Sequence, residues 1–435
     1  MQVTTSYKTK IVGYNNIFKE TLAIYHDALA YLIKVVDAEW DKLVQIRSSK
    51  LQMTYIEQQV HATAKNIAAY DFDDHFYKFP SYLRRSAIAD AIGKVSSYRK
   101  NYSNWCSAGG KGRPPKLQVN HFSFPSLFRG NMFIRLDDYT AQAKIYKQND
   151  WVWLTVKLRK SDVDYIIRHK ATAAESSPTL YRSGKKWFLR FAFTNNVELA
   201  KTIDVITAVD LGINNAATCS AMLPDGTIIG RKVISFPVEQ DQMKHKLNKV
   251  KKAQQHGARS MPRLWAYVNN INRTIAEKTA KAVIDFASLY DSETIVFEHL
   301  DFSGKKKGSK KQRLHLWRKK AVLAMATTKA HLLGMRISTV CAWNTSKLAF
   351  DGSGIVERDE DNYSLCTFQN GKRYHCDLSA SYNIGARYYI RETLKSLPVR
   401  ERLVVEAKVP QLARRTTCTL SDLINLCAEL TLLAG

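Results

Sequence analysis

The chain has 435 residues, enough for about two to four domains of ordinary size. Hydrophobic residues make up 45% of the sequence, which excludes a mainly disordered protein. Its 66 Lys and Arg residues outnumber 39 Asp and Glu residues. The resulting net charge of +27 indicates a polyanionic partner, of which nucleic acid is the commonest. A merely basic soluble protein is the alternative interpretation.

The sequence gives no sign of a membrane or secreted protein. It holds no apolar run of about 18 residues, so no membrane-spanning helix is expected, and the opening MQVTTSYKTKIVGYNN lacks the apolar segment of a secretory signal. Its basic residues are spread along the chain, which argues against binding to a membrane surface. Seven cysteines, an odd number spread from Cys106 to Cys427, indicate reduced thiols and a cytoplasmic location.

The N-terminal part divides where the hydrophobic period changes. Apolar residues recur every three or four positions from Phe18 to Leu43, and again over about 83–102, so residues 14–106 are expected to form a helical, basic domain. The Gly-, Pro- and Lys-rich segment 107–118 reads as a basic linker. Alternating apolar residues in WVWLTVKL and KKWFLRFAF then predict a β-barrel-like domain over 119–200, which the strand within residues 1–13 is expected to join.

The C-terminal part has the element order of a nuclease-like sheet. Residues 201–344 read as three strands joined as hairpins, two long helices, a strand, a helix and a last strand, the order of a ribonuclease-H-like α/β sheet. An insert over 345–375 precedes a helix over 376–395. The tail, 396–435, contains Thr419-Leu-Ser-Asp422, a pattern that predicts a capped terminal helix. Its apolar face is expected to pack within the molecule, with packing on a second copy as the alternative.

Three carboxylates stand where these elements end or begin. Alone, Asp210 after an apolar strand reads as a turn or cap residue, Glu298 in IVFEHL as half of a buried ion pair, and Asp377 in HCDLSASYNIGAR as a helix cap. In the expected strand order, however, the first and fourth strands are neighbours and a helix crosses them. Three acids gathered there need cations, and two Mg²⁺ ions roughly 3.5–4 Å apart satisfy them and suit phosphodiester hydrolysis.

The motifs VDLGINNAAT, IVFEHLDF, a basic loop followed by Trp317, NTSKLAF and HCDLSASYNIGAR resemble the RuvC motifs of transposon-associated TnpB proteins and of miniature type V-F CRISPR effectors. The resemblance covers about residues 203–390. It matches Asp210, Glu298 and Asp377 to the three RuvC acids, and Asn383 to an Asn for which a structural role is equally open. The implied fold class is multidomain α+β: a helical recognition domain, a small β-barrel-like wedge domain and a ribonuclease-H-like (RuvC) nuclease domain with a zinc-ribbon-derived insert.

One departure from this family concerns zinc. Relatives carry two CxxC pairs in the insert, whereas here the first pair is absent and Cys366 alone remains of the second. Structural zinc needs four ligands, so no zinc is expected. The insert is expected to fold as a small metal-free hairpin, in which Lys372, Arg373 and the aromatic Tyr374 could help load the strand to be cut or stabilise its developing charge.

The resemblance also implies partners and cofactors. These are a guide RNA, a target double-stranded DNA, and two Mg²⁺ ions for which Mn²⁺ can substitute, in the cytoplasm of a prokaryote and in antiviral defence. One protein copy and two copies on one guide RNA both remain open. Candidate nucleic-acid contacts are the basic residues of the helical domain, the linker and the Lys-rich loop: Arg84, Arg85, Arg99, Lys100, Lys111, Arg113, Lys116, Lys305, Lys306 and Lys307.

The function expected from these features is RNA-guided, Mg²⁺-dependent cleavage of double-stranded DNA beside a short recognised motif, through one RuvC site. The nearest alternative is a transposon-encoded TnpB nuclease. A nuclease-inactive RNA-guided repressor is a more distant one, because such proteins lose RuvC acids and this chain keeps all three. A guide-free resolvase or transposase would not need the approximately 200 residues that precede the nuclease segment.

Overall fold

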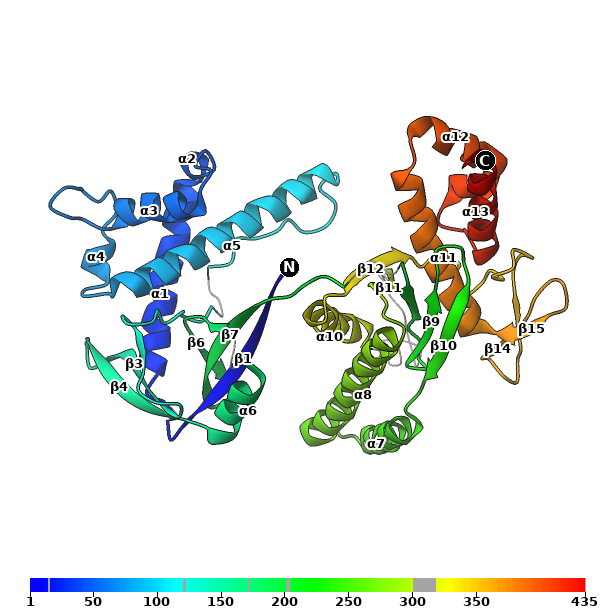
Figure 1. Ribbon diagram of the computed structural model, residues 1–435. Coiled ribbons are helices and arrows are strands. Elements are labelled where there is room, and N and C mark those ends of the chain that lie inside the picture. The colour runs from blue at the N-terminus through cyan, green and yellow to red at the C-terminus, as the bar shows by residue number, and fades with distance from the viewer. Residues whose placement is uncertain (15, 120–122, 171–172, 201–203, 300–317, 435) are drawn as a thin grey trace. The chain divides into compact units, whose positions relative to one another are not determined.

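The computed structural model describes residues 1–14, 16–119, 123–170, 173–200, 204–299 and 318–434 (Figure 1). The chain forms two compact units. The N-terminal unit comprises residues 2–195, and the C-terminal unit comprises residue 1 together with the residues from 196 onward.

The N-terminal unit is built on a seven-stranded sheet in the order β2-β3-β4-β1-β7-β5, with β6 also paired to β7. Ile11 of β1 lies opposite Leu158 of β4, so the leading strand joins this sheet as expected. The strands are β1 (Gln2–Val12), β2 (Phe133–Arg135), β3 (Thr140–Lys147), β4 (Asp150–Leu158), β5 (Ala174–Glu175), β6 (Thr179–Ser183) and β7 (Lys186–Asn196).

Helices cover this sheet and share its core. The predicted amphipathic helix is α1, whose Leu22, Tyr25 and Leu29 are buried in a hydrophobic cluster that also contains Val156 and Phe191 of the sheet. The helical segment and the strands therefore share one continuous core, because neither can bury its apolar side alone. The helices are α1 (Lys19–Ala38), α2 (Trp40–Leu43), α3 (Ser49–Val60), α4 (Phe72–His75), α5 (Ser81–Ser107) and α6 (Lys160–Lys170).

The C-terminal unit contains a five-stranded sheet in the order β10-β9-β8-β11-β12. The strands β8 (Ile206–Asp210), β9 (Ala217–Met222) and β10 (Ile228–Ile234) form antiparallel hairpins. The strand β11 (Thr294–His299) runs parallel to β8, and β12 (Arg336–Cys341) runs parallel to β11. This is the succession of strands that the sequence predicts.

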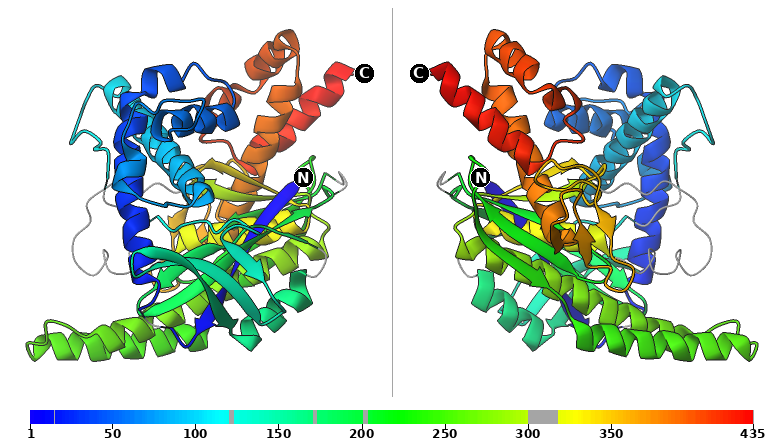
Figure 2. Two further views of the ribbon diagram at one scale, coloured as in Figure 1. Left: turned by 90° about the vertical axis from the view of Figure 1, so that its left-hand side faces the viewer. Right: turned by 90° about the vertical axis from the view of Figure 1, so that its right-hand side faces the viewer.

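Helices pack on both faces of this sheet (Figures 1 and 2). One face holds α8 and α10 over a cluster that includes Val209 and Phe297, and the other holds α11 over a cluster that includes Ala208 and Val296. Successive residues of β8 and β11 thus point to opposite faces, as the pleat of a strand requires. The helices are α7 (Pro237–Gln255), α8 (Pro262–Leu289), α10 (Lys319–Leu332) and α11 (Cys376–Ser396).

The insert before α11 is a three-stranded antiparallel sheet of β13 (Glu357–Arg358), β14 (Leu365–Thr367) and β15 (Arg373–His375). The predicted hairpin is therefore present as β14 and β15, with β13 added at its edge. The insert has its own small core, in which Val356, Cys366, Phe368 and Cys376 are buried.

The tail folds as α12 (Val399–Lys408), the 3₁₀ helix η1 (Pro410–Arg414) and α13 (Leu420–Ala434). The N–H of Thr419 donates to the Asp422 carboxylate at 2.7 Å, which is one half of the predicted capping box. Leu423 and Leu426 are buried in the cluster beneath α11, so the expected packing within the molecule is confirmed. Within the described ranges, no helix is both long and apolar enough to cross a membrane.

Gly385 sets how closely α11 approaches the sheet. A Cβ at this position would lie 2.8 Å from Met222 Cε and 3.3 Å from Ala208 Cβ, both of which are buried. We expect Gly385→Ala to destabilise the protein by about 1–3 kcal/mol through overpacking, measured by denaturant unfolding. Gly93→Ala is the matched control, because Gly93 lies in α5 with nothing within 4 Å of an added Cβ and its substitution should stabilise by up to about 1 kcal/mol. Equal effects of both variants would contradict the close contact.

Candidate active site

Asp210 and Glu298 lie side by side at the carboxyl ends of two parallel strands. Val209 of β8 is paired with Phe297 of β11, so the two acids are the next residues along their strands. Asp210 follows Ala208 by two positions, and Glu298 follows Val296 by two positions. Both acids therefore point to the face of the sheet that α11 covers. Gly212 permits the turn after β8, because a Cβ there would lie 2.6 Å from the carbonyl oxygen of Asn215.

Asp377 enters the same site from the first turn of α11. This helix packs across β8, β9, β11 and β12, which carries its first turn toward the two strand acids. His375 caps the helix by accepting from the Leu378 N–H, and the Asp377 carboxylate accepts from Asn215 Nδ2 at 2.9 Å. A carboxylate at this position is also stabilised by the helix dipole.

The carboxylates act on one another electrostatically. Burial raises the pKa of Asp210 well above its usual value, and the charges of Glu298 and Asp377 raise it further, whereas Arg358 opposes the shift. Burial also raises the pKa of Glu298, against the opposing effects of the Thr345 hydroxyl, Arg387 and Lys319. The chain therefore holds negative charge here at a cost that a bound cation would relieve.

The donors suit Mg²⁺, because three half-buried carboxylates offer the oxygen ligands that this ion prefers. Among the described residues, however, no three His, Cys, Asp or Glu side chains stand close enough to form a ready metal site. Glu298 and Asp377 are close enough to raise the pKa of Asp210, but the three carboxylates do not surround one common point. Binding an ion would thus require their side chains to move closer together.

Arg358 is a cation near this site that sequence reasoning missed. It lies on β13 of the insert, its guanidinium covers the Tyr363 ring at 4.7 Å, and its charge acts on Asp210. The predicted Lys372 is instead placed over the Phe350 ring at 4.8 Å, and Arg373 forms an ion pair with Asp359 at 2.5 Å. A cation on a short edge strand has no sequence pattern of its own, so only the folded insert identifies it.

Buried polar groups on α11 hold the insert and tail near the acids. Thr345 donates its hydroxyl proton to Glu298. Asn383 donates to the carbonyl oxygens of Thr345 at 3.1 Å and Leu348 at 2.9 Å, and accepts from the Leu420 N–H at 3.2 Å. Its role is therefore structural, one of the two roles open from the sequence.

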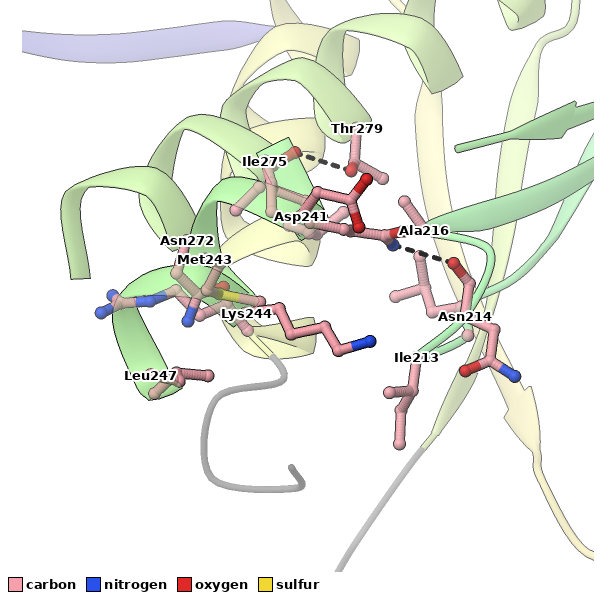
Figure 3. Close-up of a pocket in the computed structure, with 16 residues that line it drawn as sticks. Ile213, Asn214, Ala216, Asp241, Met243, Lys244, Leu247, Asn272, Ile275 and Thr279 are labelled. Atoms are coloured by element: carbon pink, nitrogen blue, oxygen red, sulfur yellow. Dashed lines mark hydrogen bonds between the residues drawn. The ribbon is translucent and has the colours of Figure 1, made fainter. Parts of the chain in front are cut away.

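A cavity of about 670 Å³ begins one residue after Asp210, on the face of α8 and α10 (Figure 3). Its lining is largely apolar, and Lys244 extends into it from α7 toward the loop of Ile213 and Asn214 (Figure 3). Gln240 Nε2 donates to the carbonyl oxygen of Asn214 at 2.9 Å and fixes that loop to α7. The turn after Asp210 is thus held from both faces of the sheet.

The basic residues predicted to contact nucleic acid fall into different environments. Arg84 is 3% exposed and pairs with Asp73 at 3.2 Å, so it is a structural cation. Arg85 pairs with Glu57 at 3.0 Å and Arg99 with Asp37 at 2.6 Å. Lys305, Lys306, Lys307 and Trp317 lie outside the described residues. The remaining four are exposed and have no ion pair to a described residue: Lys100, Lys111, Arg113 and Lys116.

A second basic surface lies on α7 and α8, which pack against each other (Figure 2). No Asp or Glu occurs between Gln242 and Ala276, and this acid-free stretch is the signal that could have identified the surface from sequence. Lys246 covers the Tyr267 ring at 4.4 Å. Its basic residues are Lys244, Lys246, Lys249, Lys251, Lys252, Arg259, Arg263 and Arg273.

Comparison with known proteins places residues 4–147 within the model of the Aq_aa04 family. No curated protein matches the chain significantly. A Cas12f1 structure, in complex with sgRNA and target DNA, is 14% identical, with 80% of this chain and 91% of that chain covered and a TM-score of 0.45. The mini-RNA-guided endonuclease CRISPR-Cas phi3 is 10% identical, with coverages of 88% and 92% and a TM-score of 0.49.

A third similar structure is C2c1 of Alicyclobacillus acidoterrestris in complex with single-guide RNA. It is 9% identical, with coverages of 86% of this chain and 68% of that chain and a TM-score of 0.43. Miniature effectors, expected from the sequence, are thus among the matching structures, whereas the likeness to TnpB stays a prediction. At these identities no residue role follows from the matches, so functional inference depends on the carboxylates themselves.

The raised pKa of Asp210 predicts how the metal-free protein responds to pH. A carboxyl with a raised folded-state pKa contributes stability below its usual pKa of about 4 and loses it as pH rises through the folded value. We therefore expect Asp210→Asn to raise the melting temperature in EDTA at pH 8, by about 2–4 °C per kcal/mol, and to do so less at pH 5.

Mg²⁺ should raise the melting temperature of the unmodified protein and leave that of the Asp210→Asn variant nearly unchanged. Asp285→Asn is the control, because Asp285 is exposed on α8 and has no ion pair to a described residue. If the Asp210→Asn variant melts at a lower temperature than the unmodified protein at pH 8, the Asp210 carboxylate is not destabilised by burial and repulsion.

Proposed function

We propose that the C-terminal unit is a ribonuclease-H-like nuclease of the RuvC type and that the chain is an RNA-guided DNA endonuclease of the miniature type V CRISPR class. The observation that carries this proposal is Asp210, whose pKa is raised by burial and by Glu298 and Asp377 where β8, β11 and α11 meet. Three acids on two parallel strands and a crossing helix suit metal-dependent phosphodiester hydrolysis.

Asp210, Glu298 and Asp377 would hold two Mg²⁺ ions, or Mn²⁺ in their place. When bound, these ions supply activation of the attacking water and stabilisation of the leaving 3′-oxygen. Asn215 and Thr345 orient the Asp377 and Glu298 carboxylates through their hydrogen bonds. Arg358 of the insert acts electrostatically on Asp210. Its charge would stabilise the negative charge that develops on the phosphate.

The N-terminal unit and the basic surfaces are proposed to hold the guide RNA and the target duplex. A net charge of +27 supports a nucleic-acid partner, as do Lys100, Lys111, Arg113 and Lys116, which are exposed and form no ion pair with a described residue. Sequence selection would then come from base pairing with the guide and from a short DNA motif. Separate helical, wedge, nuclease and insert regions, with the boundaries expected from the sequence, are part of this proposal.

The test of this function is to express the chain with its flanking locus, sequence the RNA that stays bound, and supply a matching DNA duplex with Mg²⁺. We expect one abundant RNA with a fixed scaffold and a variable end, and cleavage that Asp210→Asn, Glu298→Gln or Asp377→Asn reduces by about 10³-fold or more. DNA binding should survive in these variants. Asp285→Asn again serves as the control.

Each alternative gives a different result in the same experiment. RNA that derives from transposon ends would assign the chain to TnpB nucleases, and RNA from a repeat–spacer array would assign it to CRISPR effectors. Binding of guide and duplex without cleavage would indicate a repressor. Recovery of only random RNA, with DNA cleavage intact, would make the chain a guide-free nuclease.

The insert is proposed to hold no zinc. Burial raises the pKa of the Cys366 thiol to about 12 and also raises that of Cys376, which opposes the thiolate form that binds metals. A buried apolar cluster around Val356 and Phe368 provides the insert with a core of its own. We expect elemental analysis of purified protein to find far less than one zinc per chain, and unfolding to be unaffected by a zinc chelator. One zinc per chain would contradict this expectation.

A further inference from the structure

The C-terminal half of α5 extends beyond the packed part of its unit (Figure 1). The last buried residue of this helix is Val95, yet the helix continues for three more turns to Ser107. Most of these residues are exposed. A helix end that buries little gains little from packing, which leaves its exposed surface available to a partner.

Three aromatic side chains line one side of this exposed end. Tyr98, Tyr102 and Trp105 are four and three positions apart, the spacing that places residues on one face of a helix. The ring centroids of Tyr98 and Tyr102 are 6.0 Å apart, and those of Tyr102 and Trp105 are 5.6 Å apart. We call these three residues the aromatic ladder.

The loop after the helix fixes the last ring of the ladder. Trp105 Nε1 donates to the carbonyl oxygen of Lys111 at 3.2 Å. Gly110, with a φ of +67°, passes so close that an added Cβ would lie 3.5 Å from the indole ring. Tyr102 remains 41% exposed. The ladder is thus partly preorganised and still open to solvent.

The sequence around the ladder is basic, and Arg99 of the same helix end is paired with Asp37 at 2.6 Å. No Asp or Glu occurs from Ala91 to Leu136. Lys111, Arg113 and Lys116 lie on the loop that folds back on Trp105, whereas Lys100 lies two positions from Tyr98 and from Tyr102 and therefore on another side of the helix. The three loop cations form no ion pair with a described residue. Such cations and exposed rings match the two parts of a single-stranded nucleic acid, its phosphates and its bases.

Neutral polar side chains surround the exposed helix end. The helix end exposes hydroxyl and amide groups on Ser96, Ser97, Asn101, Ser103 and Asn104. Such groups can exchange hydrogen bonds with the ribose 2′-hydroxyl, which RNA has and DNA lacks. We therefore take RNA as the partner, and a comparison of RNA with DNA probes tests that choice.

We propose that the aromatic ladder binds unpaired bases of single-stranded RNA by stacking, while Lys111, Arg113 and Lys116 contact the phosphates. The inference rests on the proposed RNA partner, but it does not depend on the carboxylates or on cleavage. It assigns to α5 a function distinct from recognition of duplex shape, because only unpaired bases expose the faces that a ring can stack upon.

The test uses the full chain stripped of bound nucleic acid, with three labelled probes at one salt concentration: an oligouridylate RNA, the matching oligothymidylate DNA, and an RNA duplex. We expect Tyr102→Ala and Trp105→Ala each to weaken binding of the single-stranded RNA by at least about 5-fold and to leave duplex binding unchanged. Tyr102→Phe keeps the ring and should bind as the unmodified protein does. Tyr77→Ala is the control, because Tyr77 is 73% exposed elsewhere in the same unit.

Ultraviolet cross-linking of the oligouridylate, mapped by mass spectrometry, should identify Tyr102 or Trp105. Unchanged RNA affinity in both alanine variants, or equal losses for RNA and duplex, would overturn the proposal. Equal affinity for the oligothymidylate that depends equally on the ladder would overturn the assignment to RNA. If the ladder binds RNA while no defined guide co-purifies, the proposed function fails and the ladder stands.

Discussion

The parallel pairing of β8 with β11 is the constraint on which the candidate site depends. Parallel neighbours cannot be joined by a tight turn, so the chain between them runs through a hairpin strand pair and two long helices. That pairing puts Asp210 beside Glu298 at one edge of the sheet, on the same face. The third acid follows because α11 crosses this face, and Gly385 allows it to cross closely.

The insert before α11 has a buried apolar cluster of its own. Its strands are too short to be stable alone, but their apolar side chains gather with Phe350 into one cluster, and Asn383 fastens the chain before β13 to α11. The same folding brings Arg358 within electrostatic reach of Asp210. A segment that keeps only one cysteine of the two CxxC pairs therefore has an apolar cluster and places a charge near Asp210.

The excess positive charge is not uniformly available. Arg84 is buried against acids and Arg99 is paired with Asp37, so these cations stabilise the helical part of the N-terminal unit. Two acid-free stretches, Ala91–Leu136 and Gln242–Ala276, carry cations that the described residues largely do not neutralise. Positive charge available to a partner is thus concentrated where the sequence omits carboxylates, rather than wherever lysine and arginine occur.

The sequence by itself determined the elements and the three acids, because hydrophobic periods of two and about 3.6 residues are local properties of the chain. An aspartate or glutamate at the end of a buried strand is visible in the same way. Only the tertiary structure decided that the helical and β segments of the N-terminal unit share one core, and that Asn383 is structural. It alone also brought Arg358 of the insert within electrostatic reach of Asp210. Those outcomes depend on contacts between residues far apart in the chain, which no local pattern encodes.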